Sequence, residues 1–103
     1  MLLEFFLNEK MKEITEEKLN KYIAVTEKAI EKAEKSKNRT SLVKEREDCL
    51  DMIKRYFSDA LHYKEKGDFV TAFAALNYAH GWLDACARIG IFDVHDSELF
   101  TVD

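Results

Sequence analysis

The sequence contains no proline and only three glycines, at positions 67, 81 and 90. Proline and glycine are the residues that most often interrupt a helix, so nearly the whole chain is free to be helical. Gly67 and Gly90 each follow a long stretch with apolar residues at three- and four-residue spacing. A glycine in that place supplies the left-handed residue that ends many helices. The pattern therefore predicts helices that stop at Gly67 and at Gly90.

Three segments carry apolar residues at helical spacing. The first begins at Thr15, whose hydroxyl can cap free amide groups, and the third begins directly after Asp68, which can do the same. The predicted helices cover about residues 15–35, 41–66 and 68–89. We therefore predict an all-α protein: an antiparallel three-helix bundle with a helical N-terminal extension and a short packed C-terminal tail, forming a single domain over residues 1–103.

The third predicted helix is apolar around most of its circumference, which is typical of a helix that is buried on more than one side. We expect it to be central in the bundle. Its narrow polar stripe consists of Asn77, His80, Asp84 and Arg88.

The segment before Thr15 carries an apolar stripe that would suit an extra helix over about 2–13, and the tail after Gly90 is also apolar. These two ends are expected to cover each other or a second copy, so a homodimer or a protein partner is predicted.

The reversal at Gly67 and Asp68 sets the register of the hairpin formed by the second and third helices. Positions whose numbers sum to about 135 should lie level across such a hairpin. Cys49 should therefore lie beside Cys86. The two cysteines match neither a zinc-ligand spacing nor a disulfide-rich scaffold, and both are interpreted as buried thiols. No metal, cofactor or cysteine nucleophile is predicted.

The charge pattern narrows the classes of partner. The formal net charge is −4, and residues 67–103 carry one basic side chain, Arg88, against six acidic ones. Nucleic-acid binding normally requires a basic face, so no nucleic-acid partner is expected. The longest uncharged stretch, residues 69–83, is shorter than the roughly 20 apolar residues that cross a bilayer, and the N-terminal apolar run contains Glu4 and lacks a basic leader. A cytoplasmic protein without a membrane partner is expected.

Two pairs of residues could carry chemistry. His80 and Asp84 are four residues apart, the spacing at which an imidazole can bond to a carboxylate and act as a base or a ligand; the alternative is an ordinary surface or ion-pair role. Arg55 and His62 fit the loose spacing that resembles the catalytic pair of HEPN-type helical ribonucleases, although Tyr56 stands where that family usually has a polar residue. The alternative is that both simply flank the hairpin seam. No residue is assigned as catalytic.

Gly81 stands inside the third predicted helix, where it costs about 1 kcal/mol relative to alanine. Close approach of a neighbouring helix would explain it. A concavity beside His80 and Trp82 that receives a ligand or a partner's side chain is the functional alternative.

The sequence resembles two known families, and both resemblances rest mainly on the hairpin of the second and third predicted helices. The stretch Gly67-Asp68-Phe69-x-x-Ala72-x-x-x-Leu76-x-x-Ala79 resembles one tetratricopeptide unit, but only one copy is present and arrays of that class need several. A longer similarity over about residues 15–92 rests on Tyr56-Phe57-x-Asp59-Ala60-x-x-Tyr63-x-x-Lys66-Gly67-Asp68, Ala72-Phe73 and Tyr78-Ala79-x-Gly81-x-Leu83-Asp84-Ala85. These residues resemble the archaeal domain of unknown function 357 family. That resemblance implies a compact helical bundle in an archaeal cytoplasm and implies no activity.

The leading functional hypothesis is a helical protein-interaction or adaptor module that associates with itself, and not an enzyme. The rival is an RNA-processing or ribonuclease-like protein that uses Arg55 with His62, or His80 with Asp84. The two hypotheses differ in whether these side chains converge on one pocket.

Overall fold

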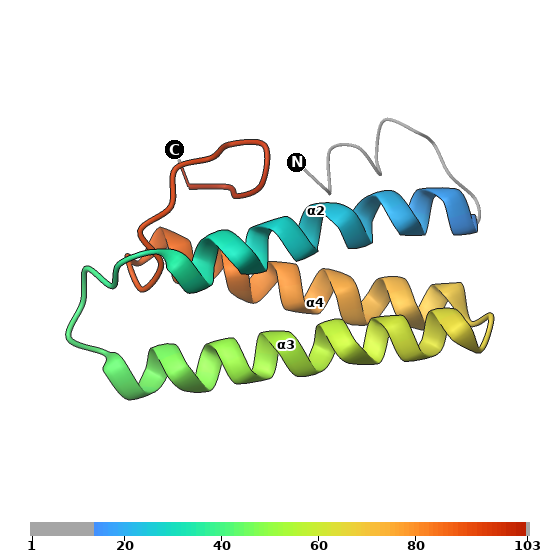
Figure 1. Ribbon diagram of the computed structural model, residues 1–103, viewed down its shortest axis with the longest axis horizontal. Helices are drawn as coiled ribbons and strands as arrows, with labels where there is room; N and C mark the ends of the chain where they lie inside the picture. Colours follow the sequence, from blue (N-terminus) through green and yellow to red (C-terminus); the bar gives the residue numbers. More distant parts are fainter. Residues whose placement is uncertain (1–13, 103) are drawn as a thin grey trace.

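The computed structural model describes residues 14–102. This part of the chain forms three α-helices, α2 (Glu16–Lys35), α3 (Val43–Glu65) and α4 (Phe69–Arg88). Helix α3 runs antiparallel to its two neighbours, so the all-α three-helix bundle predicted from the sequence is confirmed (Figure 1). The predicted helix over 2–13 lies outside the described residues. Within the described range, no helix is both long and apolar enough to cross a membrane.

The helix ends follow the local signals in the sequence. The side chain of Thr15 accepts a hydrogen bond from the Lys18 amide at 3.3 Å, and the side chain of Asp68 accepts one from the Thr71 amide at 3.1 Å. The Thr71 bonds lower the pKa of the Asp68 carboxyl. Gly67 has a φ of 79°, the left-handed conformation in which glycine avoids the steric penalty of a side chain. The tight reversal between α3 and α4 is thus built from Gly67 and the Asp68 cap.

Helix α3 begins at Val43, two residues later than the sequence predicted. The carboxamide oxygen of Asn38 accepts bonds from the amide and the hydroxyl of Thr40, at 2.9 and 2.7 Å. The Thr40 hydroxyl oxygen in turn accepts from the Leu42 amide at 3.1 Å. Side-chain bonds of this kind compete with helical backbone bonds. They hold the loop in a turn up to Leu42 and delay the helix.

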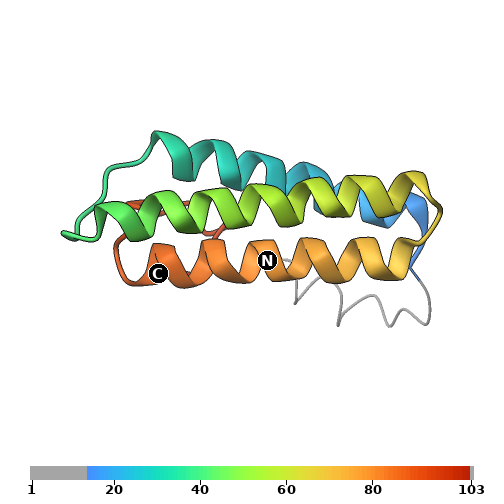
Figure 2. The same ribbon diagram turned by 90° about the horizontal axis from the view of Figure 1, so that it is seen from below.

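Helix α4 packs against both other helices, whereas α2 and α3 touch each other much less. The closest pair is α3 and α4, which lie side by side along the hairpin (Figure 2). The predicted register of the α3–α4 hairpin is also observed. The rings of Tyr56 and Tyr78 lie 4.6 Å apart between centroids, and the thiol of Cys86 is hydrogen-bonded to Cys49. Levels across this hairpin could therefore be assigned from the position of the Gly67 turn alone.

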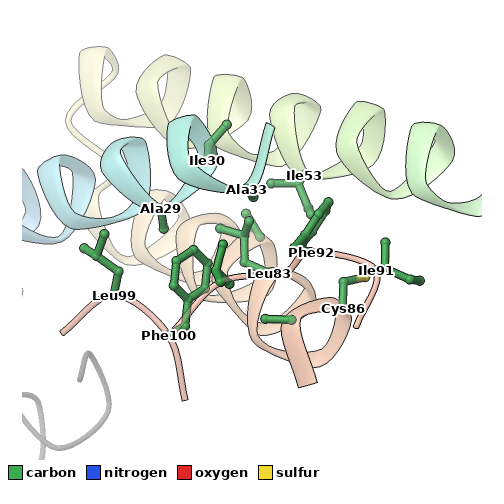
Figure 3. Packing of buried hydrophobic residues seen from close by; sticks show 13 residues of the cluster. Ala29, Ile30, Ala33, Ile53, Leu83, Cys86, Ile91, Phe92, Leu99 and Phe100 are labelled. Carbon is green, nitrogen blue, oxygen red and sulfur yellow. The ribbon is translucent and has the colours of Figure 1, made fainter. Parts of the chain in front are cut away.

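The core divides into two clusters along the bundle. Near the α3–α4 turn, the buried residues come from the three helices; they are Leu19, Tyr22, Ala60, Ala72, Phe73 and Leu76. The larger cluster at the other end includes Ile53 and Leu83 from the helices together with residues of the C-terminal tail (Figure 3). The buried tail residues are Ile91, Phe92, Val94, Leu99 and Phe100. The tail is thus part of the core, as the packed tail predicted from the sequence requires.

Backbone hydrogen bonds tie the tail to the loop between α2 and α3. The amide of Arg39 donates to the carbonyl of Gly90 at 2.8 Å, and the amide of Asp93 donates to the carbonyl of Lys37 at 2.9 Å. Gly90 has a φ of 90°, and the side chain of Arg39 lies against it. The tail therefore turns back at Gly90 and runs beside the loop before it reaches α2 and α4.

Candidate functional site

His80 was expected on a polar stripe but is buried, with 3% of its surface exposed. Its Nε2 lies 2.7 Å from the carbonyl oxygen of Leu99, and its Nδ1 lies 3.0 Å from the hydroxyl oxygen of Thr26. A carbonyl oxygen can only accept, so Nε2 carries a proton and donates it to Leu99. The imidazole thus joins α2, α4 and the C-terminal tail by side-chain hydrogen bonds.

Asp84 and Arg88, one and two turns further along α4, bind the residues that follow Leu99. The Asp84 carboxylate accepts from the Thr101 amide at 2.9 Å and from its hydroxyl at 3.2 Å. Arg88 donates to the Thr101 carbonyl at 3.2 Å. The Asp84 carboxylate is 3.9 Å from Nε2 of His80, beyond hydrogen-bonding distance. The histidine and the carboxylate therefore do not form the acid–base pair that their spacing allowed.

All three candidate residues, His80, Asp84 and Arg88, form hydrogen bonds to the C-terminal tail. The tail is an irregular segment, so its amides and carbonyls lack the partners that a helix would supply. His80, Asp84 and Arg88 provide those partners. The polar stripe of α4 is thus largely a contact with the tail, and Asn77 is the member of the stripe that stays exposed beyond it.

Arg55 and His62 both lie on the exposed side of α3, away from the tail. Arg55 forms an ion pair with Asp51, one turn earlier, at 3.0 Å, and 76% of its side chain is exposed. The ring of His62 meets the edge of Tyr63, with centroids 5.4 Å apart. His62 lies seven positions after Arg55, which is about 10 Å along a helix. The structure does not bring this pair to the buried His80.

Metal binding finds no support in the described range. Across residues 14–102, no three histidine, cysteine, aspartate or glutamate side chains are grouped closely enough to hold a metal ion.

The outer face of α4 is the main exposed apolar surface of the described chain. It carries large apolar residues, namely Val70, Tyr78, Trp82 and Ile89, whose exposed fractions range from 37% to 68%. A shallow depression of about 300 Å³ lies in the middle of this face, lined by Asn77, Tyr78, Gly81, Trp82 and Ala85. We refer to Val70, Ala74, Asn77, Tyr78, Gly81, Trp82, Ala85 and Ile89 as the outer α4 face.

Gly81 lies at the bottom of this depression. A Cβ atom built on it would meet no described atom within 4 Å. No helix within residues 14–102 approaches Gly81 closely, so the described bundle does not explain this glycine. A depression beside Trp82 is present, as the functional alternative expected, but the buried His80 does not line it.

A second depression, of about 410 Å³, lies between α3 and α4 and was not anticipated from the sequence. Its lining includes Tyr56, Asp59, Tyr63 and Tyr78. The three tyrosines follow the apolar stripes of their helices. They are at the rim of the helix pair, where each ring is only half-covered or exposed. The unusual number of tyrosines in the seam was the one signal of this site.

The two thiols meet between α3 and α4, where Cys86 is buried but Cys49 is only partly buried, so the expectation of two buried thiols is right for Cys86 alone. Burial is the main reason why the pKa of Cys86 is raised to about 12, and the hydrogen bond to Cys49 raises it further. A thiol with so high a pKa is a poor nucleophile at neutral pH because little thiolate is present.

The raised pKa predicts a pH dependence of stability. The folded state resists loss of the Cys86 proton, whereas the unfolded chain loses it near pH 9. The contribution of this thiol is therefore complete below pH 9 and decreases between about pH 9 and 12. Urea denaturation from pH 8 to 10.5 measures it as the difference between the wild type and Cys86→Ala. A constant difference across that range would contradict the prediction.

Comparison with known proteins identifies the family to which the chain belongs. Residues 21–92 match a family model described as protein of unknown function (DUF357). The matched stretch contains α2 from Lys21 onward, the whole α3–α4 hairpin and the start of the tail. Searches of curated proteins and of solved structures gave no match. Since the match spans well over half of the sequence, the chain belongs to the DUF357 family of proteins of unknown function.

Proposed function

We propose that this chain is a helical protein-interaction module that associates with a second copy of itself through the outer α4 face. The observation that carries the proposal is Gly81. A glycine inside an exposed helix costs about 1 kcal/mol relative to alanine. The bundle described over residues 14–102 gains nothing from it, since the space above it is open. A second molecule that packs into this space would explain why position 81 is glycine and not alanine.

The composition of the face supports association with a copy of the same chain. Charged residues make up 35% of the sequence, yet none of the eight residues of the outer α4 face is charged. Two such faces can meet without burying unpaired charges, which are costly to remove from water. Uncharged faces with exposed aromatic side chains are typical of the core of protein interfaces.

The order of large and small residues on this face is self-complementary. In an antiparallel pair of α4 helices related by a two-fold axis, positions whose numbers sum to about 163 lie level, because each residue advances about 1.5 Å along the axis. Large residues then lie level with small ones. These pairs are Trp82 with Gly81, Tyr78 with Ala85, and Ile89 with Ala74. Pairing of this kind lets two helices approach closely and interlock.

The alternative function, RNA processing, has weaker support. Arg55 and His62 lie on the exposed side of α3, and Arg55 is paired with Asp51. His80, Asp84 and Arg88 bind the tail. These arrangements give a structural role to three of the residues that the alternative requires, Arg55, His80 and Asp84.

The experiment replaces Gly81 with glutamine, a good helix former whose side chain would fill the depression. We expect the wild-type mass in light scattering to rise toward that of a dimer with concentration. In the Gly81→Gln protein the dissociation constant should rise at least about fivefold, because overpacking an interface costs about 1–3 kcal/mol. The monomer should unfold at an equal or higher temperature, since a helical glycine is removed.

The matched control is Ser58→Gln, which places the same side chain on the exposed side of α3. It should leave the dissociation constant unchanged. A wild-type protein that stays monomeric at high micromolar concentration would disprove self-association, and so would equal dimer affinities for the two variants.

A further inference from the structure

The depression between α3 and α4 has the chemical character of a site for a cation. Tyr56 and Tyr63 from α3 and Tyr78 from α4 contribute aromatic rings, and Asp59 contributes a carboxylate. Its volume of about 410 Å³ is within the range of pockets that bind small groups. The other lining residues, Thr71 and two alanines of α4, are uncharged. The lining therefore carries negative charge and no positive charge.

The carboxylate in this depression is available to a ligand. Within residues 14–102, Asp59 has neither an ion pair nor a hydrogen bond from a side chain. Arg55, one turn before Asp59 on the same helix, pairs with Asp51 instead, at 3.0 Å. The nearest basic side chain on the helix is thus held away from the depression.

The rings provide a second attraction for a positive charge. Tyr56 and Tyr78 are tilted by 58° with their centroids 4.6 Å apart, so they form two walls that are not stacked face to face. The face of an aromatic ring is the negative end of its quadrupole and attracts ammonium and guanidinium groups. A carboxylate beside such rings adds a charged hydrogen-bond acceptor.

We infer that this depression binds an arginine side chain of a partner protein. The guanidinium group is planar, can stack on a tyrosine ring and can donate two parallel hydrogen bonds to the Asp59 carboxylate. Its aliphatic stem can lie on Ala74 and Ala75, which also line the depression. A lysine ammonium lacks the planar stacking surface and should bind more weakly. A module that pairs through the outer α4 face and carries this site would link basic segments of partner proteins.

The test uses a short blocked peptide, acetyl-Ala-Arg-Ala-amide, with the Gly81→Gln protein. That variant weakens self-association, which shares Tyr78 with the site, so at protein concentrations below its dimer dissociation constant the result does not depend on the proposed function. We expect saturable shifts of the Ala74 and Ala75 amide signals in nuclear magnetic resonance spectra, with a dissociation constant on the order of 1 mM, as a few exposed cation–π and ion-pair contacts allow. The matching citrulline peptide has nearly the same shape without the charge and should bind at least about tenfold more weakly.

Variants locate the binding to these residues. Asp59→Asn should weaken the arginine peptide at least about fivefold, because it removes the charge of the acceptor. Asp48→Asn, which removes an exposed carboxylate from the same helix outside the depression and leaves the Arg55–Asp51 pair in place, should not change the affinity. Tyr63→Phe keeps the ring and should also bind as before.

Three outcomes would disprove the proposed arginine site: no saturable shifts, equal shifts with the citrulline peptide, or equal effects of the two aspartate variants on peptide affinity. Each leaves self-association intact. Conversely, a monomeric wild-type protein that binds the peptide would retain the site and disprove self-association.

Discussion

Replacing Arg46 with alanine is expected to lower the free energy of unfolding by about 3–4 kcal/mol, because this side chain joins three segments by bonds to their carbonyl groups. Its guanidinium donates to the carbonyl of Ile91 at 2.5 Å and to that of Ser36 at 2.6 Å. It also reaches the carbonyls of Ala33 and Glu34 at the end of α2, at 3.1 and 3.3 Å. The same group lies 5.2 Å from the centre of the Phe92 ring, a cation–π distance.

The large expected effect follows from what the substitution leaves behind. The Ala33 carbonyl also accepts from the amide and the hydroxyl of Ser36, at 3.2 and 2.7 Å. The substitution therefore orphans chiefly the carbonyls of Ser36 and Ile91, which lie outside the helices. Three of the bonds are at least partly buried. A bond from a charged donor contributes about 1.5–3 kcal/mol, and an orphaned acceptor keeps its cost of leaving water.

Urea denaturation of the wild type, Arg46→Ala and Arg46→Lys measures this effect. Lysine has a compact ammonium that cannot span several carbonyls, so it should recover less than half of the loss. Arg55→Ala is the matched control on the same helix, since its exposed ion pair contributes at most about 1 kcal/mol. Full recovery by lysine, or equal losses in the two alanine variants, would show that the bonds to the carbonyls are not the source of the stability.

Replacing Phe100 with alanine is expected to cost about 3–5 kcal/mol, the range for removal of a buried aromatic side chain. Phe100 is 1% exposed and lies in the larger core cluster with Leu99 and Leu83 (Figure 3). It also stands between the two residues of the tail that α4 binds through hydrogen bonds. The substitution should therefore loosen the tail as well as empty part of the core.

Hydrogen exchange combined with denaturation distinguishes these two effects. The Thr101 amide, which donates to Asp84, should lose its protection in Phe100→Ala, because the tail can then detach without unfolding the bundle. Val43→Ala, at a position that is 63% exposed, should change stability by less than about 0.5 kcal/mol. A Phe100→Ala protein that keeps both its denaturation midpoint and the protection of Thr101 would disprove the role of the tail as part of the core.

Local features of this protein could be predicted because each depends on residues within about one helical turn. The caps at Thr15 and Asp68 and the left-handed Gly67 are set by hydrogen bonds and sterics within four residues. The level of Cys49 with Cys86 follows from the turn, since two antiparallel helices advance at the same rate. The start of α3 was placed two residues too early because the side-chain bonds of Asn38 and Thr40 in the loop were not anticipated.

The amino-acid sequence by itself determined where the helices lie, how the α3–α4 hairpin is aligned, and that the tail would be buried. Only the tertiary structure decided what the polar residues of α4 do, because their partners are about 20 or more residues away or belong to an irregular segment. His80, Asp84 and Arg88 bind the tail, and the apolar face around Gly81 is left uncovered by residues 14–102. Hydrophobic periodicity reports that a helix has more than one apolar side, but which side stays uncovered depends on how many neighbours the rest of the chain can supply.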